Sequence, residues 1–175
     1  GIVYVTEDRK IEGFFETMTI AENLYMGALA ADQNKGVVVS MADMRTLAAE
    51  WTKTLNIRAI NSNARVIELS GGNQQKVTIG RWLASGVDIL LLFDPTRGID
   101  VRTKRQIYLL VRELAEQGAS VLYYTSELAE VPAACDRAAV IFNGRLVDVI
   151  EAANADEQTL MRAAYGLTGA EAVPA

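Results

Sequence analysis

The chain lacks several residue types on which enzymes and secreted proteins often depend. It has 175 residues with no histidine, three prolines and one cysteine, Cys135. Without histidine, the usual general base and the commonest transition-metal ligand are both missing. A single cysteine excludes an intramolecular disulfide and is typical of a reducing compartment. Histidine-based catalysis and a disulfide-stapled fold are therefore excluded.

Long hydrophobic runs and an excess of positive charge are missing as well. No apolar run approaches the 18 or more residues of a membrane span, so any membrane role must go through a partner. The formal net charge of -5 argues against a nucleic-acid partner, because a phosphate backbone selects clustered Lys and Arg. Hydrophobic residues make up 50% and charged residues 22%, which is typical of a globular domain.

Hydrophobic periodicity predicts an α/β domain with a mainly parallel sheet. The unbroken apolar run at 88–93 predicts a parallel strand that is covered on both faces. Asn143-Gly144 predicts a type I′ hairpin turn. The stretch 17–61 contains no predicted strand and should form a separate helical layer. The expected strands are 1–5, 88–93, 120–125, 138–142 and 145–149; the helices are 19–29, 40–55, 72–84, 101–117, 127–134 and 156–165; 6–10, 32–39 and the tail after Gly166 are expected to be irregular.

The run Leu69-Ser-Gly-Gly-Asn-Gln-Gln-Lys76 carries the clearest chemical signal. Ser70, Gly71 and Gly72 open a predicted helix, where two glycines allow close approach of a ligand and free N–H groups favour an anion. Ser-Gly-Gly alone is also typical of an ordinary capped helix. The longer motif, followed by a buried strand, is far more specific.

With these residues the chain resembles the ATP-binding cassette (ABC) ATPases, in particular the second cassette of bacterial monosaccharide importers of the ribose, galactose and xylose type. The resemblance covers roughly residues 1–150. It implies a partial P-loop NTPase domain over 1–175, with an inserted helical subdomain at about 17–61. The signature, Walker B, D-loop and switch region would occupy 62–150, and a C-terminal helix and tail 151–175. The matching segments are 6–10, 69–76, 95–100, 126–131 and 135–137.

The resemblance implies a role for each matching residue. Ser70, Gly71, Gly72 and Gln74 look like the signature that contacts the γ-phosphate of an ATP held by the opposing cassette. Asp100 resembles the D-loop aspartate at the seam between cassettes. Glu7 stands where most ABC proteins have the Q-loop glutamine, which links the nucleotide to the transmembrane subunit. Glu7 could equally be a solvated loop charge.

The Walker B segment departs from the family pattern. The family has Asp-Glu-Pro-Thr, where Asp organises Mg²⁺ and Glu polarises water, whereas this chain has Phe93-Asp94-Pro95-Thr96. Asp94 either takes the Glu position or is the metal-binding Asp of a shortened segment, and a purely structural carboxylate is a third interpretation. Ser126 stands in place of the switch histidine. One carboxylate and no histidine should orient water poorly.

The sequence also has no Gly-x-x-x-x-Gly-Lys-Ser/Thr loop. We expect a segment of a longer protein, cut before its Walker A loop and inactive alone, that donates its signature to a composite site. ATP and Mg²⁺ would bind in the full-length assembly. The implied partners are another cassette, permease subunits and, indirectly, a periplasmic sugar-binding protein, at the cytoplasmic face of the bacterial inner membrane. An incomplete sheet with an apolar edge is expected to favour self-association.

Two other functions fit the same motifs. The chain could belong to a non-transport ABC ATPase of DNA repair or translation, although its acidic balance counts against this. It could also be a purely structural or regulatory cassette. Co-purification with permease subunits would favour the importer, whereas ribosomes or DNA would favour the first alternative.

Overall fold

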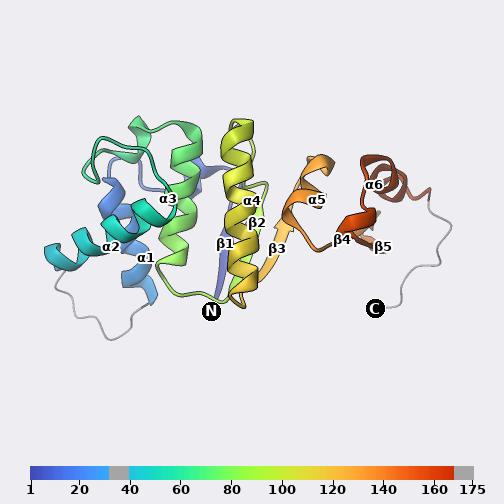
Figure 1. The fold of residues 1–175 in the computed structure, drawn as a ribbon, viewed down its shortest axis with the longest axis horizontal. Helices are drawn as coiled ribbons and strands as arrows, with labels where there is room; N and C mark the ends of the chain where they lie inside the picture. The colour runs from blue at the N-terminus through green and yellow to red at the C-terminus, as the bar shows by residue number, and fades with distance from the viewer. Residues whose placement is uncertain (32–39, 168–175) are drawn as a thin grey trace. The chain divides into compact units, whose positions relative to one another are not determined.

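The computed structural model describes residues 1–31 and 40–167. It divides into two compact units, Gly1–Tyr124 and Thr125–Ala175, which are considered separately (Figure 1). The loop predicted at 32–39 and the tail from residue 168 lie outside the described residues. In the described part of the chain, no helix is long and apolar enough to cross a membrane.

A parallel three-stranded sheet forms the centre of the first unit. The strands are β1 (Ile2–Val5), β2 (Ile89–Phe93) and β3 (Ser120–Tyr124), in the order β1-β2-β3. Val5 is paired with Leu92, and Phe93 with Tyr124. The predicted parallel sheet is therefore confirmed, and the loops that follow its strands lie along one edge.

Four longer helices accompany this sheet. The Ser40 hydroxyl accepts a hydrogen bond from the Asp43 N–H, 3.2 Å away, as the sequence predicted. One expectation was wrong: the polar loop at 6–10 runs into a helical turn at Arg9–Gly13, because the Asp8 carboxylate accepts the Ile11 N–H and starts it. The helices are α1 (Ile20–Ala31), α2 (Met41–Thr54), α3 (Gly71–Leu83) and α4 (Val101–Glu116), with a 3₁₀ turn at Val66–Glu68.

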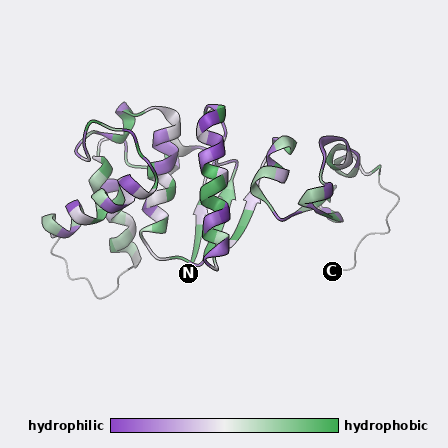
Figure 2. Ribbon diagram, viewed as in Figure 1, coloured by the Kyte–Doolittle hydropathy of each residue, from purple (hydrophilic) through white to green (hydrophobic). Residues whose placement is uncertain are grey.

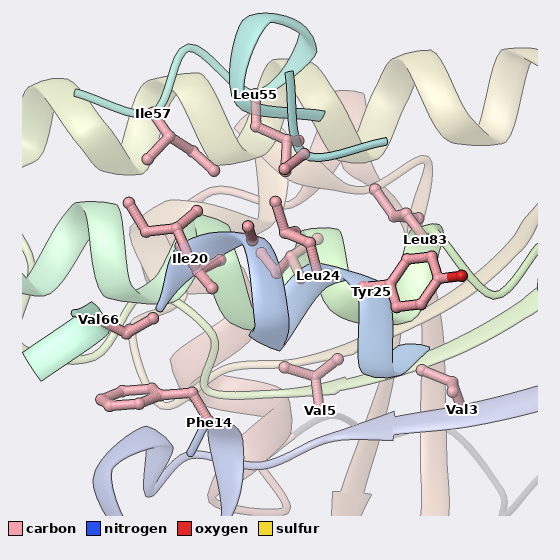
Figure 3. Packing of buried hydrophobic residues seen from close by; sticks show 14 of the residues in the cluster. Val3, Val5, Phe14, Ile20, Leu24, Tyr25, Leu55, Ile57, Val66 and Leu83 are labelled. Carbon is pink, nitrogen blue, oxygen red and sulfur yellow. The ribbon is translucent and has the colours of Figure 1, made fainter. Parts of the chain in front are cut away.

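The core of the first unit joins α1 to α3 and to the sheet. Ile20 and Leu24 are fully buried on α1 and pack in one cluster with side chains from the sheet and the neighbouring loops (Figure 3). Gly27 brings the two helix backbones together, since a β-carbon there would overlap the carbonyl oxygen of Arg81. This close packing fixes α3 and, with it, the glycines at its start.

Only one face of the sheet is fully covered by the described residues. Val5, Leu90 and Leu92 are buried in the cluster shared with α3 and α4. On the opposite face, Tyr4 and Leu122 are 52% and 66% exposed. In β2 itself, Ile89 on this face is 37% exposed, whereas Leu91 and Phe93 are partly buried. The strand expected to be covered on both faces is therefore fully covered on one face and partly on the other, and the sheet contains hydrophobic stretches that appear green in Figure 2.

The second unit is built around a hairpin. Asn143 and Gly144 have φ values of 49° and 74°, which confirms the predicted turn with positive φ at both positions. A small separate core includes Ile150 and Leu160. The helix predicted at 127–134 is instead a 3₁₀ turn followed by α5. The elements are a 3₁₀ turn at Leu128–Glu130, α5 (Val131–Ala134), β4 (Arg137–Phe142), β5 (Arg145–Glu151), a 3₁₀ turn at Ala152–Asn154 and α6 (Glu157–Ala164).

Candidate functional site

The start of α3 presents an exposed serine and two glycines. Ser70 is the N-cap, but its side chain makes no capping hydrogen bond to the first helical turn. The Asn73 side-chain N–H instead donates to the Ser70 hydroxyl at 3.0 Å, and the Asn73 side-chain oxygen Oδ1 accepts the Arg58 backbone N–H at 3.0 Å. The first N–H groups of a helix have no partner within it. An anion such as a phosphate could therefore bind at this end of α3.

Gly72 connects the start of α3 to the start of α4. A β-carbon at Gly72 would lie 2.6 Å from the Thr103 side chain, so no larger residue fits without movement. Thr103 in turn donates its N–H and its hydroxyl to the Asp100 carboxylate, at 3.0 and 2.8 Å. These two hydrogen bonds, the hydroxyl first, hold the pKa of Asp100 below its usual value. The structure thus brings the predicted signature and D-loop residues together around one threonine.

Lys76 adds a buried charge behind this cluster. Its ammonium group donates to the Asn56 carbonyl oxygen at 2.9 Å. Burial, followed by the nearby Arg58, lowers the pKa of Lys76, while Asp100 acts in the opposite direction. The ammonium group is tied to the loop that precedes the signature.

A second group of predicted residues lies at the carboxyl edge of the sheet. Arg97 Nη1 and Glu7 Oε2 are 2.7 Å apart and form a salt bridge between the loops after β1 and β2. Asp94 is buried and has a φ of 44°, and its N–H donates to the Tyr124 carbonyl oxygen at 2.9 Å. In parallel α/β sheets, ligands bind beyond this edge. Glu7 and Asp94 therefore lie on neighbouring loops, as the parallel strands require.

Phe93, the residue before Asp94, packs against aromatic rings and has no side-chain atom that could bind a metal ion. The Phe93 ring stacks on Tyr124 with 4.1 Å between centroids, and Tyr4 lies 6.3 Å away in a tilted arrangement. Across the described ranges, no group of three or more Asp, Glu, His or Cys could hold a metal ion. Mg²⁺ demands octahedral oxygen ligands from carboxylates, waters and phosphates. Asp94 can supply one of these, so the residues present do not fit a self-sufficient Mg²⁺ site.

Gln74 and Ser126 are the remaining predicted residues. Gln74 is buried, and its side-chain amide donates to the Ile67 carbonyl oxygen at 3.3 Å. Ser126 is exposed and belongs to the second unit. Their proposed contacts with nucleotide stay predictions.

Sequence reasoning did not single out three residues that organise the site. Asn73 is the unspecified position of the signature motif, and one of its two hydrogen bonds comes from the loop at Arg58. Thr103 contributes to the site only because Gly72 packs against it, and this contact is not visible in the sequence. Arg97 is part of the Pro-Thr-Arg-Gly segment, but its pairing with Glu7, 90 positions away, follows from the sheet register.

Comparison with known proteins identifies a family and several relatives. Residues 1–97 match the family model described as "ABC transporter". A ribose import ATP-binding protein of Rhizobium johnstonii is 42% identical over 169 residues, which is 97% of this chain and 33% of that protein. The ribose import ATP-binding protein of Geobacillus kaustophilus is 42% identical over 166 residues, with 95% and 33% covered. The chain thus spans about a third of the length of these relatives.

Solved structures share the fold. An ATP-binding cassette described as a dimer in a post-hydrolysis state with ADP and Pi has a TM-score of 0.72 and 24% identity, covering 86% of this chain and 62% of that one. An inward-facing putative metal-chelate type ABC transporter has a TM-score of 0.76 and 20% identity, covering 94% and 63%. At these identities the likeness establishes the fold alone, and it agrees with the predicted α/β class.

Proposed function

Because the chain belongs to the ABC transporter family, we propose that it is part of the ATP-binding component of a sugar importer and donates Ser70, Gly71 and Gly72 to a composite ATP site. The observation that carries this proposal is the start of α3, where an exposed serine leaves the helical N–H groups uncapped. The proposal that the imported substrate is a sugar comes from the relatives that are named as ribose import proteins. Substitution of Ser70 in the assembled importer is the direct test, and loss of ATP hydrolysis is expected.

The two groups of residues would take different parts in this site. Ser70, Gly71 and Gly72 would bind the γ-phosphate of an ATP held by the other cassette, with Gln74 supporting the helix from within. Asp100 would lie at the seam, held by Thr103. The packing of Gly72 on Thr103 supports a common role, since neither group can shift without the other.

The nucleotide's metal would depend on the other cassette. Mg²⁺, when bound, would neutralise charge on the phosphates. In this chain Asp94 is a single carboxylate beside an aromatic ring, in either of its two proposed roles, and Ser126 cannot act as a base as histidine does. We therefore assign water activation to the other cassette.

The proposed partners follow from the same assembly. The helical layer at about 17–61 would meet the permease subunits, at the cytoplasmic face of the bacterial inner membrane. The segment 62–150 would face the second cassette, and 151–175 would add a C-terminal helix and tail. A periplasmic sugar-binding protein would act through the permease. Neither the non-transport ATPase nor the purely structural cassette gains support from the named relatives.

The isolated chain should bind ATP very weakly. Its sequence has no phosphate-cradling loop of the Gly-x-x-x-x-Gly-Lys-Ser/Thr type, so the Kd should exceed about 1 mM. Isothermal titration calorimetry with and without Mg²⁺ measures this directly. Micromolar binding to the chain alone would contradict the donor role.

The partly exposed sheet face should make the isolated chain associate with itself. Replacing Leu122, which is 66% exposed there, with lysine should weaken association by about 10-fold or more, because a charge disrupts an apolar contact. Leu109→Lys is the matched control, since Leu109 is 61% exposed on α4. Sedimentation velocity over a range of concentrations gives the answer. A wild-type chain that is monomeric throughout would refute the proposal.

A further inference from the structure

The Glu7–Arg97 salt bridge joins two segments that the proposed function assigns to different surfaces. Glu7 precedes the turn at Arg9–Gly13, which leads into the helical layer. Arg97 precedes Gly98 and Ile99, which lead to Asp100 at the start of α4. The bridge therefore lies between the segment facing the permease and the segment facing the second cassette.

The backbone at Arg97 is firmly held. The Arg97 N–H donates to the Asp94 carbonyl oxygen at 3.1 Å, which closes a turn after β2. Thr96 is buried, and its hydroxyl lies 3.3 Å from the Tyr123 hydroxyl on β3. Arg97 thus projects from a turn anchored on the sheet.

The loop that Arg97 reaches is also ordered. The Asp8 N–H donates to the Thr6 hydroxyl at 3.2 Å, and the Glu12 N–H donates to the Asp8 carbonyl oxygen at 3.1 Å. Arg81 of α3 then donates to the Gly13 carbonyl oxygen at 3.3 Å. A displacement of Glu7 would therefore be passed to a structured segment.

We propose that Arg97 is a positioning residue that holds Glu7 and couples the loop after β1 to the segment leading to Asp100. The bridge occupies the Glu7 Oε2 oxygen and so fixes the direction in which the carboxylate points. The coupling needs no nucleotide in this cassette's own site. It is therefore compatible with a chain in which Asp94 alone does not make a self-sufficient Mg²⁺ site. Only the naming of the two surfaces rests on the proposed function; the positioning itself is a property of this chain.

Because the Arg97–Glu7 salt bridge is exposed, its effect on the position of the loops can be measured separately from its effect on stability. The side chains of Arg97 and Glu7 are 66% and 40% exposed, and salt bridges at such positions contribute little to the free energy of unfolding. Removing the bridge should leave the urea midpoint of the first unit unchanged. Local opening of the two loops should nevertheless increase.

Hydrogen exchange of the 175-residue chain tests the positioning. Arg97→Gln should speed exchange at residues 8–12 and 99–103 by about three-fold or more, without affecting α6. The double variant Glu7→Arg with Arg97→Glu should return both segments to within about two-fold of wild type. Arg45→Gln, an exposed arginine on α2, is the control and should change neither segment. Unchanged exchange in Arg97→Gln, or a double variant no slower than the single one, would overturn the proposal.

Salt and the assembled importer supply two further readouts. About 0.5 M NaCl should speed exchange in the same two segments of the wild type and leave Arg97→Gln unaffected, since only the wild type has a bridge to screen. In the full-length importer, Arg97→Gln should lower the ratio of sugar-stimulated to basal ATP hydrolysis by about three-fold, and the charge swap should restore it. A normal ratio in Arg97→Gln would disprove the coupling, whereas wild-type ATP hydrolysis in Ser70→Arg would disprove the donor role instead.

Discussion

Gly27→Ala should lower the free energy of unfolding of the first unit by about 3 kcal/mol or more. The β-carbon would overlap the carbonyl oxygen of Arg81 and lie 2.6 Å from its carbonyl carbon. Both atoms belong to the α3 backbone, so no side chain can rotate away to relieve the overlap. The helices must separate, and their separation would open the core around Leu24, which is fully buried.

Tryptophan fluorescence gives a clean measurement of this effect. The chain has two tryptophans, Trp51 and Trp82, and both lie in the first unit. Urea titration followed by their emission therefore reports the unfolding of that unit alone. Met26→Ala is the matched control, because Met26 neighbours Gly27 and is 37% exposed. It should change the free energy by about 0.5 kcal/mol or less. An alanine variant at position 27 as stable as this control would show that α1 and α3 are not held in contact.

Much of the fold follows from local signals in the sequence. Ser40 and Asp43 mark the start of α2, Asn143-Gly144 makes the hairpin, and Gly118 with a φ of 100° ends α4. Each depends on a few adjacent residues and their backbone preferences. The order of parallel strands is similarly constrained by the alternation of apolar runs and helices.

The partly exposed sheet face could not be predicted in the same way. The run at 88–93 has the composition of a strand buried on both sides, and composition cannot tell whether the covering layer is present in this chain. The alternation appears only in the structure, where Leu90 is buried and Ile89 is 37% exposed. Local sequence encodes the preference for burial, whereas the burial of each position depends on which elements pack against the sheet.

The site residues also fall into those that local sequence predicts and those that depend on distant contacts. Ser70, Gly71 and Gly72 were predicted because helix starts with glycines favour anions, a property that adjacent residues determine. Thr103 and Arg97 were missed because their contacts, with Gly72 and Glu7, join segments far apart in the sequence. Such contacts depend on helix packing and sheet register, which a motif does not specify.

Ser70→Arg should reduce ATP hydrolysis by the full-length importer by about 10²-fold or more. The arginine would place a bulky cation over the N–H groups at the start of α3, where a helix terminus already disfavours positive charge. It would also remove the hydroxyl that the Asn73 amide contacts at 3.0 Å. The γ-phosphate could then no longer approach Gly71 and Gly72. The KM for ATP should change little, because the other cassette holds the nucleotide.

Two companion variants and one stability measurement make this result interpretable. Ser70→Ala retains the backbone N–H groups, so it should retain much more activity than the arginine variant. Gln117→Arg adds the same charge after the far end of α4, where a cation is tolerated, and should hydrolyse ATP at the wild-type rate. The urea midpoint of Ser70→Arg should match the wild type, because Ser70 is exposed and caps nothing with its side chain. Full activity in a folded Ser70→Arg importer would leave a structural cassette as the better account of this chain, since the start of α3 would then be dispensable for ATP hydrolysis.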